Sequence, residues 1–371
     1  MKLKFLALIL VVFTGLQSQA QTHMVTHEKN RSIFGLPIAD IDSVKLTSTL
    51  QLVHLKVTPV FVDSTLLSNI DSVTHAVPVT NNLYNVISAI DTFSQFKTGI
   101  DVGELNPFPY ALSGNYTSLV PTNRTLTSYG INTAGLTPAV NNSVISYHTL
   151  VGKYNTADFP IGENVKYYTA NYPADSVFVT KTATNVYVNG VTINTAANKR
   201  NISASNGLVH EVQDFLFPPG GNIYTEINRA GRGYDSIAKL VARAAIADPT
   251  IINTLQSSVY TLLAPSNAAI TTFLTGFGGL ISNIPTQTAL NLVKDHLLLN
   301  RKFFINIALN NTNGTLSYGG GLLKLSLAPS GVSSPTGIVA YYNLSKAVIV
   351  NEFDYLQQNG VIHKIGGVLT Q

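Results

Sequence analysis

The sequence predicts an α+β fold in which one domain is carried twice in tandem. Short apolar strands bounded by Pro, Gly and Asn turn signals outnumber the helical patterns. Two sequence motifs recur in the same order, and a histidine recurs between them. The length of 371 residues suits two domains with some additional sequence.

The first repeated motif joins a strand to a helix. It reads YTSLVPTN from Tyr116 to Asn123 and YTLLAPSN from Tyr260 to Asn267. In each copy, proline ends an apolar strand, and the Ser/Thr and Asn that follow offer an N-cap. The apolar spacing from Asn267 to Leu274 then predicts a helix.

The second motif is a turn followed by a strand. It reads NGLVHEV from Asn206 to Val212 and NGVIHKI from Asn359 to Ile365. We expect a positive-φ turn at each Asn-Gly, followed by a strand with alternating faces. His148 and His296 lie between the two motifs of their copies, so three matches recur at a nearly constant offset. That agreement is the main reason for predicting a duplication.

Further elements follow from local patterns. Val186 to Ile193 predicts a hairpin with an Asn-Gly turn. Tyr234 to Ile246 predicts a helix capped by Asp235, and Ala289 to Leu299 predicts a second helix that carries His296. The predicted organisation is a signal peptide at 1–20, an unassigned segment at 21–79, and domains at 80–219 and 222–371, joined by a linker at 217–221. Leu52 to Val62 is strand-like, with no counterpart in the repeat.

These motifs resemble those of the fasciclin domain family over roughly residues 80 to 371. The residues that carry the resemblance are Pro121, Asn123, Asn206, Gly207 and His210 in the first copy, and Pro265, Asn267, Asn359, Gly360 and His363 in the second. The family's Tyr-His pair is matched by Tyr147-His148, whereas the second copy has Asp295-His296. The first copy also departs from the family in a polar, proline-interrupted stretch from Asp101 to Asn115.

The resemblance implies that each domain is a twisted β-wedge or sandwich with helices packed at one end. It also implies an extracellular protein that acts in adhesion by binding proteins or glycans. Tyr147, His148 and His296 are the candidate binding residues on this basis, with a packing and hydrogen-bonding role as the alternative.

The N-terminus has the features of a secretory leader. Lys2 and Lys4 precede an apolar run from Phe5 to Gly15, and small residues up to Ala20 favour cleavage after Ala20. A retained N-terminal anchor is the alternative, and no other run approaches the length of a membrane span. We therefore expect a secreted protein that is extracellular, periplasmic or surface-associated.

Composition narrows the possible functions. Charged residues make up only 11% of the chain, and the formal net charge is +4, which argues against a nucleic-acid partner. The absence of cysteine excludes disulfides and thiolate chemistry.

We expect no enzyme activity, cofactor or metal site. The sequence contains no Gly-x-Ser-x-Gly elbow, and its acidic residues are too scattered to nominate a catalytic pair. His210 and His363 lack partners at ligand spacing, so a structural role is expected for both. His23 and His27 are four residues apart and could bind zinc if they lay on a helix. We interpret Gly231-Arg232-Gly233 as a linker and helix start.

Two functions remain open: an adhesion protein, or a glycan- or small-ligand-binding module of the cell envelope. Tyr167-Tyr168 and Tyr341-Tyr342 could stack on sugars, though they fit edge strands equally well. The partner is thus an unknown protein or glycan at the cell surface.

Overall fold

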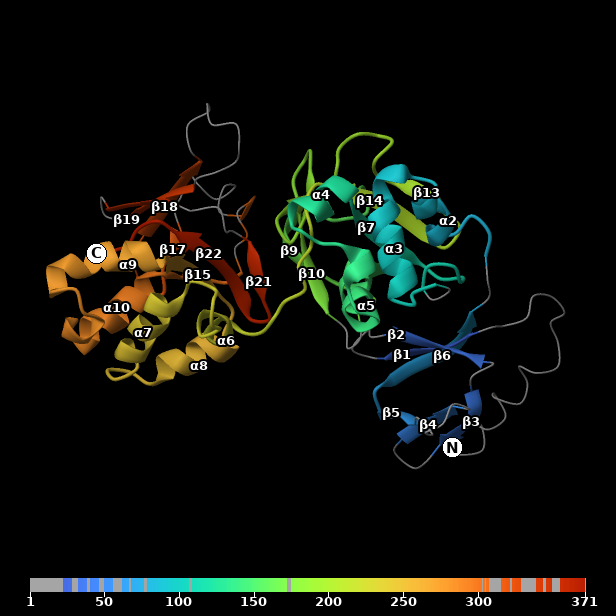
Figure 1. Cartoon of the computed structure of the whole chain (residues 1–371), viewed down its shortest axis with the longest axis horizontal. Helices are drawn as coiled ribbons and strands as arrows, with labels where there is room; N and C mark the ends of the chain where they lie inside the picture. Colours follow the sequence, from blue (N-terminus) through green and yellow to red (C-terminus); the bar gives the residue numbers. More distant parts are fainter. Residues whose placement is uncertain are drawn as a thin grey trace.

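The structure is a computed structural model that describes most of the chain. The described residues are 23–28, 33–38, 41–46, 50–55, 62–66, 68–76, 79–106, 109–171, 175–301, 303, 305–306, 315–320, 322–327, 338–342, 345–348 and 354–370. The predicted leader and residues 56–61 of the strand-like run lie outside them. Figure 1 shows an N-terminal group of strands, a central domain and a C-terminal domain.

The N-terminal segment forms two small antiparallel sheets, with strand orders β2-β1-β6 and β3-β4-β5. The strands are β1 His23–Glu28, β2 Ile33–Pro37, β3 Ile41–Leu46, β4 Leu50–Leu55, β5 Val62–Leu66 and β6 Ile70–Ala76. The strand-like pattern that starts at Leu52 therefore belongs to β4 as far as Leu55. Val25 of β1 is buried together with Leu112, which joins this segment to the central domain.

The central domain contains the first copy of both motifs. Its helices are α2 Leu83–Ser88, η2 Asp91–Phe93, α3 Ser94–Val102, α4 Asn123–Ser128, η3 Thr133–Gly135 and α5 Pro138–Tyr147. Its strands are β7 Tyr116–Pro121, β8 Thr149–Val151, β9 Gly162–Tyr168, β10 Ser176–Lys181, β11 Val186–Val188, β12 Val191–Thr192, β13 Ile202–Ala204 and β14 Gly207–Val212.

The C-terminal domain contains the second copy. Its helices are α6 Ile223–Ile227, α7 Asp235–Ala244, α8 Thr250–Ser257, α9 Asn267–Phe273, η4 Leu274–Phe277, η5 Ile281–Asn283 and α10 Thr286–Asp295. Its strands are β15 Tyr260–Pro265, β16 Leu297–Leu299, β17 Thr315–Leu316, β18 Leu322–Leu327, β19 Ile338–Tyr342, β20 Ser345–Val348, β21 Tyr355–Gln357 and β22 Gly360–Ile365.

Both domains have the same sheet topology. The orders β13-β14-β7-β8 and β21-β22-β15-β16 correspond strand by strand, as do β9 to β12 and β17 to β20. At the centre of the first sheet, the two motifs pair as parallel strands, with Tyr116 opposite Gly207 and Tyr260 opposite Gly360. Motifs far apart in the sequence are therefore neighbours in space. The predicted α+β class and tandem duplication are confirmed.

The strand-to-helix junction forms as the first motif predicts. Thr122 and Ser266 are the N-caps of α4 and α9, and each side chain accepts a hydrogen bond from the backbone N–H three residues later. This satisfies an N–H group that the first helical turn leaves without a partner. The two copies therefore solve the same local problem with the same chemistry.

Two helix predictions need correction. Asp235 is the first residue of α7 and not its cap. The N-cap is Tyr234, whose side chain forms no capping hydrogen bond. The helix predicted from Ala289 to Leu299 ends at Asp295, because His296 is its C-cap and Leu297 begins β16. The apolar run 297–299 enters the sheet since β15 offers it backbone partners.

The glycines of the two Asn-Gly motifs do not have the positive φ that we expected. A Cβ on Gly207 would overlap the carbonyl oxygen of Tyr116, and one on Gly360 would overlap that of Tyr260. Glycine is therefore needed for close approach of two backbones. The Asn189-Gly190 turn does have positive φ at both residues, which confirms the predicted hairpin of β11 and β12.

The two domains are joined by a packed contact as well as by the chain. Phe303, Leu356 and Val361 of the C-terminal domain are buried in one hydrophobic cluster with residues of the central domain, such as Val177 and Val179. Next to it, Arg301 lies 3.9 Å over the ring of Phe178. Hydrogen bonds from Asn164 to the Arg301 carbonyl and from Asn306 to Thr180 extend this contact. Among the described residues, no helix is long and apolar enough to cross a membrane.

Candidate functional site

The asparagine of the second motif holds the start of its domain to the sheet. The Asn206 side chain accepts a hydrogen bond from the Leu83 N–H at 2.8 Å and donates to the carbonyls of Pro109, Tyr110 and Leu112. In the second copy, Asn359 accepts from the Ile223 N–H and donates to the carbonyls of Leu255 and Ser258. The carbonyls of Pro109, Tyr110 and Leu112 belong to the irregular stretch before Asn115, so in the first copy this stretch has a structural role.

The asparagine of the first motif makes a comparable local connection. Asn123 accepts from the Gln95 N–H at 2.9 Å and donates to the Asp91 carbonyl. Asn267 accepts from the Ser236 N–H at 3.0 Å, in the first turn of α7. The first turn of α7 is therefore capped by the side chain of Asn267, from another part of the domain, and not by Asp235 as we expected.

His148 and His296 are buried at equivalent positions. The Nε2 atom of each accepts a backbone N–H, from Leu216 at 3.1 Å and from Leu369 at 2.9 Å. The proton must therefore be on Nδ1, which donates to the carbonyl four residues earlier. Burial lowers the pKa of both imidazoles to about 4. Both side chains are neutral connectors that hold the last segment of each domain.

His210 and His363 have equivalent roles on β14 and β22. Nδ1 of His210 accepts from the Asn201 N–H, and Nδ1 of His363 accepts from the Asp354 N–H. His210 also bonds the Tyr154 carbonyl through Nε2 at 2.9 Å, and burial lowers its pKa. These contacts agree with the structural role expected for both histidines.

The copies differ at the residue before the central histidine. Tyr147 is fully buried, donates to the Ser176 carbonyl at 3.2 Å and accepts from the Asn189 side chain at 2.9 Å. Burial raises the pKa of its hydroxyl. In the second copy, Asp295 is buried against Gly319. Tyr147 thus reaches the second sheet of its domain, while Asp295 contacts a turn.

The three candidate binding residues, Tyr147, His148 and His296, each have an exposed fraction of 0%. A partner could not touch them without rearrangement, so the geometry favours the packing alternative, and their binding role stays a prediction. His23 and His27 lie on strand β1, not on a helix. A strand rises roughly 3.3 Å per residue, so residues four apart are too far from each other to bind one metal ion. No group of three metal-ligating side chains gathers in the described part of the chain.

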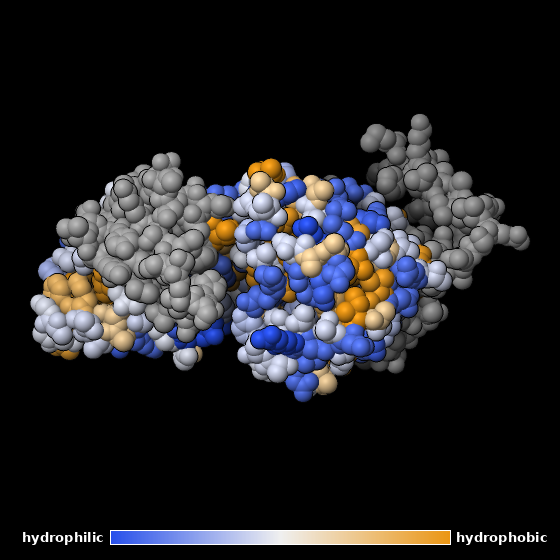
Figure 2. Space-filling view, turned by 90° about the horizontal axis from the view of Figure 1, so that it is seen from above, coloured by the Kyte–Doolittle hydropathy of each residue, from blue (hydrophilic) through white to orange (hydrophobic). Residues whose placement is uncertain are grey.

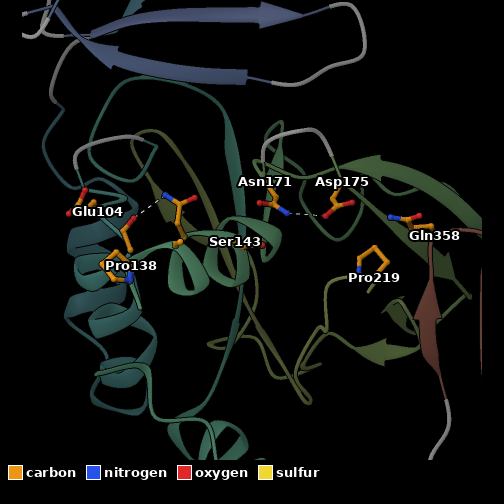
Figure 3. A pocket seen from close by; sticks show the side chains of 10 residues that line it. Glu104, Pro138, Ser143, Asn171, Asp175, Pro219 and Gln358 are labelled. Atoms are coloured by element: carbon orange, nitrogen blue, oxygen red, sulfur yellow. Dashed lines mark hydrogen bonds between the residues drawn. The ribbon is translucent and has the colours of Figure 1, made fainter. Parts of the chain in front are cut away.

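A cavity that the motifs did not indicate lies where the domains meet. It has a volume of about 700 Å³ and lies between the start of α5, the end of α3, the β9–β10 connection, the linker and the turn before β22. Figure 3 shows Glu104, Ser143, Asn171, Asp175 and Gln358 around it. The complete lining is Gly103, Glu104, Pro138, Ala139, Asn142, Ser143, Asn171, Asp175, Pro219 and Gln358.

The lining offers amides, a hydroxyl and two carboxylates, and none of its residues is Lys or Arg. Asn171 donates to the Asp175 carboxylate at 2.9 Å, and burial raises the pKa of that carboxyl. Glu104 has a φ of 56°, a conformation that is uncommon for a residue other than glycine and that occurs at ligand sites. Such a lining suits a neutral ligand rich in hydroxyl groups.

Comparison with known proteins gave a match among solved structures and a family match. The solved structure of a FAS1 domain pair from the insect cell adhesion molecule fasciclin I matches 76% of this chain and 97% of its own, at 14% identity and a TM-score of 0.35. A search of curated proteins gave no match. The sequence matches the Fasciclin domain over residues 79–218 and again over 236–371. This chain therefore belongs to the Fasciclin domain family, with two such domains in tandem.

Proposed function

We propose that this protein is an exported adhesion protein that binds another molecule at a cell or matrix surface and catalyses no reaction. Fasciclin domains in tandem occur in adhesion-type proteins. The observation that carries the proposal is that the polar side chains repeated in both domains form hydrogen bonds within the fold. Asn206, His148 and His210, like their second-copy equivalents, bond the backbone of their own domain, so they are not available for chemistry.

The surface supports recognition by contact. Figure 2 shows small hydrophobic areas set among hydrophilic residues on the face that it draws. The packed contact around Phe303 would keep the two domains in one relative orientation, so that a partner could use both at once. We take 80–219 and 222–371 as the domains, and 217–221 as the linker between them.

The test combines export with adhesion. Cells that express the full chain are expected to release a protein that begins at Gln21, because the leader is removed after Ala20. Beads coated with this protein should adhere to cells of the source organism, and soluble protein should compete. N-terminal sequencing and bead counting are the measurements. Retention of Met1 inside the cell, or adhesion equal to albumin-coated beads, would sink the proposal.

A second candidate function, a glycan-binding module, is favoured by the cavity at the domain junction. Its amide and hydroxyl side chains are the groups that bond sugar hydroxyls. The sugar would contact both domains, because the lining includes Ser143 from the central domain and Gln358 from the C-terminal domain.

Removal of two of these side chains is expected to weaken sugar binding. On a glycan array followed by calorimetry, Ser143→Ala/Gln358→Ala should bind about 30-fold more weakly than wild type, since each of the two lost hydrogen bonds contributes about 1 kcal/mol. Gln256→Ala is the control, because Gln256 is exposed on α8 and lies outside the cavity lining. Equal affinity of the double variant and the control would remove the cavity as the sugar site.

A further inference from the structure

Three basic side chains lie close together on the C-terminal domain, and two of them pair with one buried carboxylate. Glu226 on α6 is fully buried, and its Oε1 accepts from Arg232 Nε at 2.7 Å. Arg229 Nη1 lies 3.4 Å from the other carboxylate oxygen. Lys364 on β22 donates to the Arg232 carbonyl at 3.5 Å. Arg229, Arg232 and Lys364, here termed the basic cluster, therefore carry a local excess of two positive charges over Glu226.

The cations are held in place but remain accessible. The Arg232 guanidinium lies 4.7 Å over the ring of Tyr355, and Lys364 Nζ lies 5.0 Å from the ring centre of Tyr234. The side chains of Arg229 and Arg232 are 48% and 40% exposed. Glu226 engages one nitrogen of each guanidinium, whereas a guanidinium has five N–H donors. Donors in a fixed arrangement are therefore left for an anion from solution.

The first copy has no equivalent of this cluster. Helix α2 of the central domain and helix α6 of the C-terminal domain begin in the same way, since the N–H groups of Leu83 and Ile223 each donate to the motif asparagine of their own domain. In this register, Val86 replaces Glu226, Ala89 replaces Arg229, and Glu211 on β14 replaces Lys364. The shared fold therefore does not require the cluster, which is specific to the C-terminal domain.

We infer that the basic cluster binds the carboxylate or sulfate groups of an acidic polysaccharide. A guanidinium fork is suited to such groups, because it can form two parallel hydrogen bonds to one oxyanion. Protein segments that bind anionic membranes typically have about four to eight basic residues, more than this cluster has. The cluster also does not form the extended basic stripe that nucleic-acid binding needs. The uncharged residues Asn222, Thr225 and Asn228, on and beside α6, are exposed or partly exposed, and hydroxyl and amide groups of this kind can bond sugar hydroxyls.

The inference rests on the proposed function, because it names a ligand for the adhesion protein. The probes are immobilised alginate, which carries carboxylates, and dextran sulfate, with neutral dextran as the reference. The full chain should bind at least one acidic polymer, and more weakly as salt is added. Arg229→Ala and Lys364→Ala should each lower the affinity about 10-fold. Arg124→Ala, which removes an exposed cation from α4 of the central domain, should leave it unchanged.

Several outcomes would overturn the inference. These are failure of the wild type to bind either acidic polymer, an equal loss with Arg124→Ala, or equal binding to polyglutamate or to anionic vesicles. Thermal melts establish that each variant is folded. Bead adhesion is measured in parallel with polymer binding. Wild-type adhesion together with unchanged polymer affinity in Arg229→Ala/Lys364→Ala would reject the site alone, whereas polymer binding without wild-type adhesion would reject the proposed function alone.

Discussion

Asn206→Ala is expected to lower the free energy of unfolding by about 4 kcal/mol, because it removes buried hydrogen bonds to four backbone groups, one of which, the Tyr110 carbonyl, keeps the Tyr84 N–H as a second partner. The affected groups are the Leu83 N–H and three carbonyls between Pro109 and Leu112. Loss of this side chain detaches the first helix and the irregular stretch from the sheet. Urea denaturation followed by circular dichroism measures the change in stability.

Two further variants make this result interpretable. Asn359→Ala should destabilise somewhat less, since the Asn359 side chain bonds three backbone groups instead of four. Asn253→Ala is the control, because Asn253 is exposed on α8 and exposed substitutions usually change stability by less than about 0.5 kcal/mol. A loss below about 1 kcal/mol for Asn206→Ala would show that the hydrogen bonds of the Asn206 side chain do not stabilise the domain.

Acid is expected to destabilise both domains through His148 and His296. In the folded state burial lowers the pKa of each imidazole to about 4, against 6.5 when unfolded. The unfolded chain therefore binds more protons between these values. The stabilisation is complete above pH 6.5 and is lost as the pH falls towards 4. Each histidine accounts for a loss on the order of 3 kcal/mol.

The double variant His148→Gln/His296→Gln isolates this effect. Glutamine places an acceptor near the position of Nε2 but does not titrate, so the variant should lose less stability than wild type between pH 6.5 and 4. Urea denaturation across this pH range gives the difference between the two proteins, and carboxyl titration cancels in it. Parallel curves for wild type and variant would contradict the assignment of neutral, buried histidines.

Local chemistry made much of the fold predictable. The Pro-Thr and Pro-Ser junctions predicted strand ends and N-caps correctly, since these effects act within a few residues. The Asn189-Gly190 hairpin was predictable for the same reason. The predictions for Asp235, for residues 297–299 and for φ at Gly207 and Gly360 were wrong. In each case a distant segment supplied the deciding contact: Asn267, β15, or the strand that starts at Tyr116 or Tyr260.

The sites were less predictable than the fold. The cavity combines Glu104, Ser143, Asp175 and Gln358 from separate parts of the chain, and no local pattern relates them. The basic cluster joins Arg232 to Lys364 across more than a hundred residues. Both depend on which segments become neighbours, and that follows from the parallel pairing of β15 with β22 and from the contact between the domains.

The sequence by itself determined the duplication, the α+β class and the family, because repeated motifs and short-range turn and cap chemistry are written in consecutive residues. Only the tertiary structure decided what the repeated side chains do. Packing buried Tyr147, His148 and His296 and bonded them to the fold, which leaves recognition to surfaces assembled from distant segments. The physical reason is that burial and hydrogen-bond partners are properties of the whole packed chain.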